Sequence, residues 1–133
     1  MQTFLPFPDF ARSAQVLDYK RLGKQRVEVL QLLNGSWANH PASKMWRGFE
    51  YQLAEYGKIV CIEWRNRGYN DSCLDKITVL QYDLEDTGLP PWFGNQDFHE
   101  SHQSNLIRKD RVFYKPKFPQ AREGLPYIWP ATR

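Results

Sequence analysis

Hydrophobic residues recur every three or four positions in three regions of the chain, a spacing that predicts amphipathic helices. The first predicted helix begins after Asp9, which suits an N-cap, and ends before Asn34-Gly35, which favours a left-handed turn. Ahead of it, residues 1–8 are expected to be extended, because two prolines disfavour helix there. The apolar arc of this helix comprises Val16, Tyr19, Leu22, Val27, Val29, Leu30 and Leu33.

The second region carries the longest apolar stripe of the chain. Its predicted helix starts at Pro41, since proline suits a first helical turn, and ends near Arg67-Gly68. A third helix is expected from residue 95 or 97 to Asp110. The stripe of the second helix comprises Met45, Trp46, Phe49, Leu53, Tyr56, Val60 and Trp64, and it indicates a buried core face.

Two segments outside these helices are less regular. Residues 70–86 fit either a strand or a short helix around Ile77, because a short apolar run does not distinguish the two. The tail after Asp110 contains several prolines, yet it is too apolar to be disordered. We therefore expect an all-α fold: a single compact domain over residues 1–133, with three main helices and an irregular aromatic and basic C-terminal tail.

Polar side chains also follow helical spacing on the first predicted helix. They are predicted to form one stripe, at i, i+3, i+4 and i+7: Arg21, Lys24, Gln25 and Glu28. The stripe is either a solvated face or a face that binds phosphates, with one acid held among cations. Inside the apolar arc, Arg26 requires a partner, because a buried unpaired charge is costly, and Gly23 indicates a close backbone approach.

The charge distribution is more informative than the net charge. The chain has 18 Lys and Arg against 15 Asp and Glu, and this small excess does not by itself imply nucleic acid. Between residues 108 and 123, however, cations alternate with three aromatic residues. These are Arg108, Lys109, Arg111, Lys115, Lys117 and Arg122, with Phe113, Tyr114 and Phe118. The segment suits a nucleic-acid surface, and equally a basic tail that its aromatic residues pack onto the domain.

The cysteine content and the hydropathy of the chain indicate in which cellular compartment the protein is expected. Cys61 and Cys73 are expected to be reduced thiols of a cytoplasmic protein. We see no signal-peptide pattern and no apolar stretch long enough to cross a bilayer. We expect a cytoplasmic monomer with no membrane contact.

The histidines invite a metal hypothesis. His99 and His102 are three positions apart on a predicted helix, and His40 lies in a loop, whereas zinc needs a third or fourth ligand. His102 falls on an apolar face, which favours a hydrogen-bonded core histidine, so we expect no metal and no cofactor. A remaining candidate nucleophile is the α-amine of Met1, a larger fraction of which is neutral at physiological pH than of a lysine amine.

Three segments, in order along the chain, carry a resemblance to a known family. The first is Asp18–Lys24, where the family has an acid, Tyr, Arg, Glu, Leu, Pro and Arg. The second is residues 67–70, Arg-Gly-Tyr-Asn, where the family has Arg-Gly-Phe-Asn. The third is residues 101–118, similar to the family's last helix and aromatic tail at Leu106, Asp110, Tyr114 and Lys115. The chain thus resembles the bacteriophage pyrimidine-dimer DNA glycosylases, and within them a shorter branch of phage and bacterial proteins that open with Met-Gln-Thr-Phe-Leu-Pro.

The resemblance implies duplex DNA as the partner and a damaged base as the target. In that family a nucleotide opposite a UV dimer is flipped out, and the N-terminal amine attacks C1′ of the sugar. A β-elimination then nicks the strand at the abasic site. Transferred to this chain, the nucleophile is the amine of Met1, and Lys20 and Lys24 hold phosphates.

The chain departs from the family pattern at two positions. The family's catalytic glutamate falls on Arg21, which cannot act as a general base. The family's nucleophile is a threonine exposed by methionine removal, whereas bulky Gln2 blocks such removal here. Glu28, two turns beyond Arg21 on the same stripe, is a candidate replacement for the acid; a simple intrahelical pair with Lys24 is the alternative.

We therefore predict a DNA-repair N-glycosylase, with abasic-site lyase activity through an imine, that acts on a damaged or modified base. The catalytic candidates are Met1 and Glu28. The DNA-binding candidates are Lys20, Arg21, Lys24, Gln25, Arg108, Lys109 and Lys115. Two alternatives remain open: a catalytically silent DNA-binding protein of the same fold, and a protein-interaction module whose cations meet an acidic partner.

Overall fold

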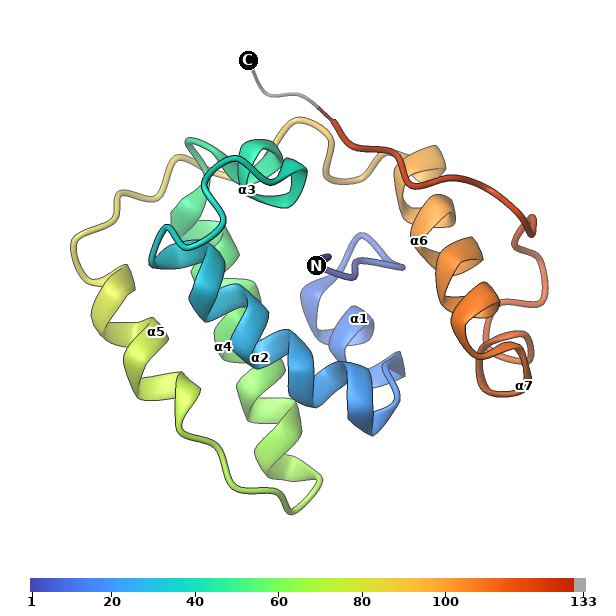
Figure 1. Ribbon diagram of the computed structural model, residues 1–133, viewed down its shortest axis with the longest axis horizontal. Helices are drawn as coiled ribbons and strands as arrows, with labels where there is room; N and C mark the ends of the chain where they lie inside the picture. The colour runs from blue at the N-terminus through green and yellow to red at the C-terminus, as the bar shows by residue number, and fades with distance from the viewer. Residues whose placement is uncertain (131–133) are drawn as a thin grey trace.

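Helices account for all of the regular secondary structure in residues 1–130, the part of the chain that the computed structural model describes. This confirms the predicted all-α class, with seven helices in that part (Figure 1). Their bounds are α1 (Phe10–Val16), α2 (Tyr19–Leu33), α3 (Pro41–Trp46), α4 (Glu50–Asn66), α5 (Cys73–Gln81), α6 (Gln96–Lys109) and α7 (Arg111–Tyr114).

The first predicted helix is interrupted, so its continuity was wrongly predicted. Leu17 is extended, with ψ 139°, and Asp18 starts α2 by accepting a hydrogen bond from the Arg21 amide at 3.3 Å. The charged stretch that starts at Lys20 therefore lies in the first turns of α2 and not in the middle of a long helix. The predicted end is confirmed, because Asn34 caps α2 and the glycine after it has φ +86°.

The second predicted helix is also interrupted, between α3 and α4. Gly48, with φ +89°, lies in the break, and its amide donates to the Glu50 carboxylate at 3.0 Å. The ambiguous segment after residue 70 forms helix α5, not a strand. Helix α6 begins after Asn95 and is capped by Asp110 at its end, as predicted. Between residues 110 and 130 the tail contains only the short α7.

Helices α1, α2 and α5 pack against α4, which lies at the centre of this group (Figure 1). The α2–α4 crossing is close: a Cβ built on Gly57 would lie only 2.5 Å from Cγ1 of Val29. Trp92, from the loop before α6, is part of the same core and donates its indole N–H to the Met45 carbonyl. Helix α6 lies on the opposite side of the N-terminal segment, residues 1–7, as Figure 1 shows.

Side chains of three helices bind the backbone of the N-terminal segment. On one side, the Phe4 amide donates to Gln25 of α2 at 2.7 Å, and its carbonyl accepts from the Tyr56 hydroxyl of α4. On the other side, the Leu5 amide donates to Nδ1 of His102 at 2.9 Å, and Nδ1 of His99 lies 2.7 Å from the Leu5 carbonyl. The backbone of Phe4 and Leu5, which has no neighbouring strand, is thus hydrogen-bonded by side chains on both sides.

Both histidines of α6 are neutral in this arrangement. Nε2 of His99 accepts from the Gly94 amide, so its Nδ1 carries the proton that binds Leu5. Nδ1 of His102 accepts, which requires it to be unprotonated. Burial lowers the pKa of His99 and lowers the pKa of His102 to about 3. The prediction that His102 is a hydrogen-bonded core histidine is confirmed.

The neutral state of His102 predicts acid sensitivity. The unfolded chain binds a proton at His102 below about pH 6.5, whereas the folded chain does not, so stability falls as the pH falls from there. We expect the free energy of unfolding to decrease by about 2 kcal/mol between pH 7 and pH 5 from this residue. His102→Asn should flatten this dependence in urea titrations, and His40→Asn should keep most of it. An unchanged slope in His102→Asn would contradict the assignment.

Candidate functional site

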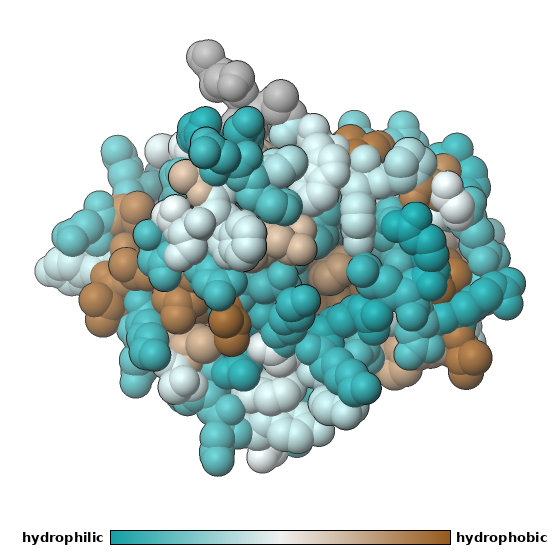
Figure 2. All heavy atoms as spheres, viewed as in Figure 1, coloured by the Kyte–Doolittle hydropathy of each residue, from teal (hydrophilic) through white to brown (hydrophobic). Residues whose placement is uncertain are grey.

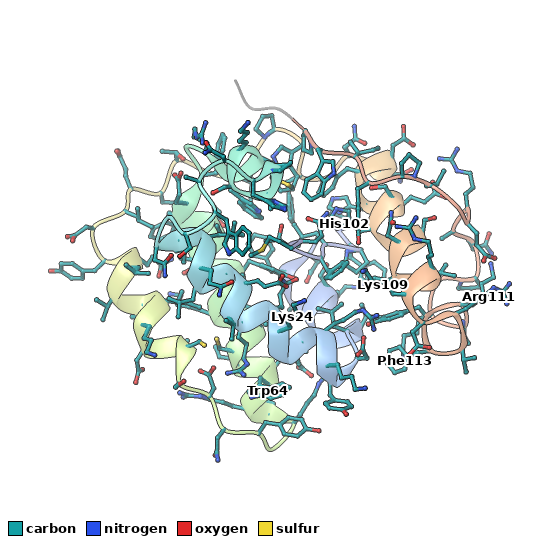
Figure 3. The ribbon with its side chains drawn as sticks, viewed as in Figure 1. Lys24, Trp64, His102, Lys109, Arg111 and Phe113 are labelled. Carbon is teal, nitrogen blue, oxygen red and sulfur yellow. The ribbon has the colours of Figure 1, made fainter. Side chains whose placement is uncertain are left out.

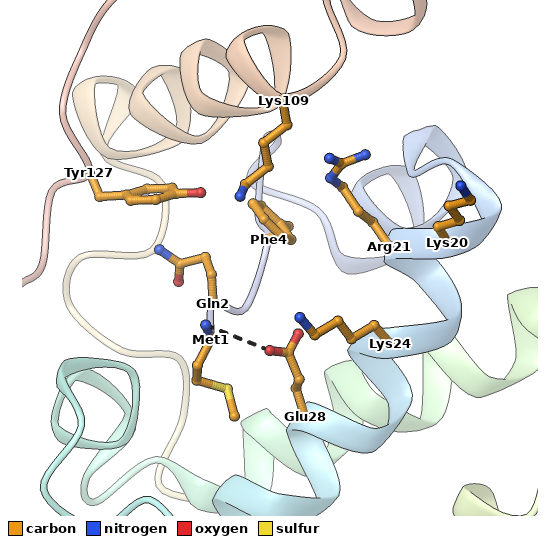
Figure 4. A pocket seen from close by; sticks show the side chains of 9 residues that line it. All are labelled: Met1, Gln2, Phe4, Lys20, Arg21, Lys24, Glu28, Lys109 and Tyr127. Carbon is orange, nitrogen blue, oxygen red and sulfur yellow. Dashed lines mark ion pairs between the residues drawn. The ribbon is translucent and has the colours of Figure 1, made fainter.

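A cavity of about 300 Å³ opens where the N-terminus meets α2, α6 and the C-terminal tail. Residues from all four parts of the chain line it, as Figure 4 shows. They are Met1, Gln2, Phe4, Lys20, Arg21, Lys24, Glu28, Lys109 and Tyr127. Of the seven predicted site residues with a charged side chain, five line this cavity, together with the amine of Met1.

The amine of Met1 and the carboxylate of Glu28 meet in this cavity. Its nitrogen lies 3.8 Å from Oε2 of Glu28, and both side chains are almost fully buried (Figure 4). Burial raises the pKa of Glu28, and the Met1 ammonium, Lys24 and Lys109 partly oppose that shift. The structure thus brings Met1 and Glu28, the two residues proposed from the sequence as catalytic candidates, together in one cavity. The arrangement pairs a primary amine with an acceptor that binds protons more strongly than an exposed glutamate does.

Gln25, in contrast, does not face solvent, so its prediction as a DNA contact was wrong. Its side chain is fully buried, accepts from the Phe4 amide and donates to the Gln2 carbonyl at 2.7 Å. The polar stripe of α2 thus turns inward at Gln25 and Glu28, because the N-terminal segment offers polar backbone partners there. Two residues of the predicted apolar arc, Tyr19 and Val27, are exposed instead.

Cations from two helices surround the amine–carboxylate pair. Lys20, Arg21 and Lys24 come from α2, and Lys109 comes from the end of α6 (Figure 4). Arg21 is held by Asp18, with 3.0 Å between Nη1 and Oδ1. Burial lowers the pKa of Lys109, and the neighbouring cations lower it further. This concentration of positive charge suits an anionic ligand.

The same face of the molecule is polar over its middle. Figure 2 shows hydrophilic side chains across this region, and Figure 3 places Lys24 and Lys109 there, between α2 and α6. Arg111 and Phe113 lie at the edge of the face beside α7 (Figure 3). The cavity thus opens within an extended polar surface, which would allow contact with a large ligand.

The remaining predicted cations do not line the cavity. Arg108 is exposed and donates to the Asn105 side chain, and Lys115 pairs with Glu123 at 3.3 Å. Arg111 and Arg122 also bind acids. The charges of the basic tail are therefore largely neutralised. Tyr114 and Phe118 are buried, so the tail is packed onto the domain by its aromatic residues, the second of the two possibilities that the sequence left open.

Arg26 and Gly23, the two residues that interrupt the predicted apolar arc, both have the contacts expected from the sequence. Arg26 binds the buried Asp71 carboxylate, and its guanidinium lies 4.6 Å from the centre of the Trp64 ring. A Cβ on Gly23 would lie 2.8 Å from Trp64. Both features fix α2 against α4 and the α4–α5 loop, and thereby fix the position of Glu28.

Gln2, Phe4 and Tyr127 belong to the cavity but were not predicted from the sequence. Gln2 and Phe4 are close to Met1 in the sequence. Because residues 1–8 were expected to be extended, their closeness to the candidate nucleophile could have placed them in the site. Tyr127 lies in an irregular segment far along the chain, where no periodicity relates it to α2. Within residues 1–130 no group of three or more metal-ligating side chains occurs, and no helix there is long and apolar enough to span a membrane.

The fold and the cavity define an all-helical protein with its first amine held against a buried glutamate among cations. A comparison with family models identifies a match over residues 1–77, more than half of the chain, to the family described as pyrimidine dimer DNA glycosylase. The chain belongs to this family, and the family implies a DNA substrate. No curated protein and no solved structure matches the chain.

The burial of Gln25 predicts a structural role. Gln25→Leu would leave the Phe4 amide and the Gln2 carbonyl without partners in the interior. We expect it to lower the free energy of unfolding by about 2–5 kcal/mol, measured by urea denaturation. Gln15→Leu, at an exposed position of α1, is the control and should change stability little. Wild-type stability of Gln25→Leu would show that these hydrogen bonds do not hold the segment.

Proposed function

We propose that the protein is a DNA N-glycosylase that removes a damaged pyrimidine through an imine at its N-terminal amine and then cleaves the abasic site. One observation carries the proposal: the Met1 amine lies 3.8 Å from the buried Glu28 carboxylate, inside a cavity lined by cations. Membership of the pyrimidine dimer DNA glycosylase family supports the substrate class.

The first chemical step needs a neutral amine. Glu28 accepts a proton from the Met1 ammonium, and the free nitrogen lone pair attacks C1′ of the sugar. The C1′–N bond to the base breaks, and its electron pair leaves with the base, which takes up a proton. Glu28 also places negative charge beside the cationic sugar that forms as this bond breaks.

The second step follows from the covalent intermediate. The nitrogen loses its second proton as the sugar ring opens, which gives an imine between Met1 and C1′. Removal of a proton from C2′ then expels the 3′ phosphate, so the strand is nicked by β-elimination. Water hydrolyses the imine and releases Met1. Lys20, Lys24 and Lys109 lie where they could neutralise the phosphates of the strand.

The position of Arg21 supports Glu28 as the acid. Arg21 takes the position of the family's glutamate, and its side chain is bound to Asp18. Glu28 is the acidic residue among those that line the cavity, and it forms the ion pair with the amine. Glu28, two helical turns beyond Arg21 on α2, is thus our candidate for the catalytic acid.

Glu28→Gln tests the chemistry directly. We expect it to abolish release of the base from duplex DNA that carries a thymine dimer, because the amide cannot take the proton from Met1. DNA affinity should stay within a few-fold of wild type. Glu85→Gln, at an exposed position outside the cavity, should keep full activity. Excision assays and equilibrium binding measure both quantities.

Borohydride trapping identifies the nucleophile in the same system. A covalent adduct on dimer or abasic DNA, mapped to the Met1 amine by mass spectrometry, is the expected result. Full activity of Glu28→Gln would remove that residue from the mechanism. Intact DNA binding with no adduct on any substrate would favour the catalytically silent DNA-binding protein.

The cations predict a salt-dependent affinity for DNA. Lys24→Gln and Lys109→Gln should each weaken binding to all duplexes and reduce the slope of log K against log salt by about 1. Lys76→Gln, on α5 and outside the cavity, should leave the slope unchanged. Binding titrations between 50 and 200 mM salt measure this, and unchanged slopes for Lys24→Gln and Lys109→Gln would exclude them as phosphate contacts.

A further inference from the structure

The side-chain amide of Gln2 has a fixed orientation and an unused donor. Gln2 is only 4% exposed, and its Oε1 accepts from the Thr3 amide at 2.9 Å. This bond requires the oxygen on that side, so the NH₂ group faces the other way. Nε2 is buried and has no hydrogen-bond partner.

The hydroxyl of Tyr127 is a second buried donor without a hydrogen-bond partner. The ring of Tyr127 packs 5.6 Å from the ring of His102 and 6.5 Å from that of Phe4. Burial raises the pKa of Tyr127 to about 12, so the hydroxyl keeps its proton and can donate it. Tyr127 belongs to the irregular tail, whose side chains are not constrained by a helix.

Both groups line the cavity on the same side. In Figure 4, Gln2 and Tyr127 lie next to each other, and the amine of Lys109 lies beside Tyr127. Lys20 and Arg21 lie at the opposite end, and Met1 and Glu28 lie below the space between the two ends. Buried donors without partners are unfavourable and uncommon, and a ligand that brings acceptors would satisfy them. The cavity thus has Lys20 and Arg21 at one end and two uncharged donors, next to Lys109, at the other, with the amine–carboxylate pair along one wall.

We propose that Gln2 and Tyr127 bind carbonyl oxygens of the pyrimidine that is removed, and that they select bases bearing such oxygens. The inference rests on the proposed function. If Met1 attacks C1′, the phosphates extend toward the cations, and the base extends toward the uncharged donors. O2 and O4 of a thymine both accept hydrogen bonds, whereas cytosine has a donating N4 amino group in place of O4, which the NH₂ group of Gln2 cannot bind.

A phosphate oxygen would offer the same acceptor chemistry, and abasic DNA distinguishes the two sources. An abasic duplex retains the sugar and its phosphates but lacks the base. Loss of a donor to the base should therefore impair excision far more than trapping at an abasic site. Loss of a donor to a phosphate should impair both to a similar extent.

Tyr127→Phe removes only the unpartnered hydroxyl, so the free protein should keep its stability. We expect the ratio of thymine-dimer excision to borohydride trapping on abasic DNA to fall about tenfold, the effect of losing one hydrogen bond in a buried site. Tyr82→Phe, at a position that is 88% exposed, is the matched control and should leave this ratio unchanged.

Gln2→Met gives an independent second test at the other donor. It keeps the length of the side chain and removes the NH₂ group together with the oxygen that accepts from the Thr3 amide. The lost Thr3 bond affects excision and trapping alike, so a fall in the same ratio reports the NH₂ group. An equal loss of excision and trapping in both variants, or no loss in either, would overturn the assignment of the base. Failure of the unmodified protein to trap abasic DNA would instead overturn the proposed function, and this inference with it.

Discussion

The site depends on the hydrogen bonds that hold the backbone of Phe4 and Leu5 between two halves of the molecule. Gln25 and Tyr56 bind this backbone from the α2–α4 side, and His99 and His102 bind it from α6. An extended segment without a neighbouring strand would otherwise leave its amides and carbonyls unpaired in the interior, at a cost of about 1–3 kcal/mol each. These four side chains replace the missing strand, and they direct the Met1 amine onto Glu28.

The same constraint explains which residues of α2 face inward. A helix packed only on apolar neighbours would bury Val27 and expose Gln25, whereas here Gln25 is buried and Val27 is exposed. The N-terminal segment requires a side chain that both accepts and donates at one point, and a glutamine amide meets that need. One turn further along α2, the first amine of the chain requires an acid, and Glu28 occupies that position.

Periodicity predicted the helical class and the ends of the helices at Asn34 and Asp110, because caps and repeats are local signals. It did not predict the breaks at Asp18 and Gly48, where a polar or flexible residue is compatible with both a continuous and a broken helix. The inward position of Gln25 was not predictable either, since no pattern within α2 shows that a backbone lies against it. Met1 and Glu28 were candidates from the family resemblance and helical spacing, but their contact was not predictable, because no pattern relates the N-terminus to α2. Tyr127 carried no signal in its irregular segment.

The bonds to Leu5 span more than ninety residues of sequence, from the extended N-terminal segment to α6. Such long-range contacts form late and slowly, because the intervening loop must close before they stabilise anything. During synthesis the first residues therefore leave the ribosome long before the histidines that anchor them. The cavity is completed only when α6 and the tail have been made, so a chain interrupted before α6 would carry the amine and the acid without a site to hold them.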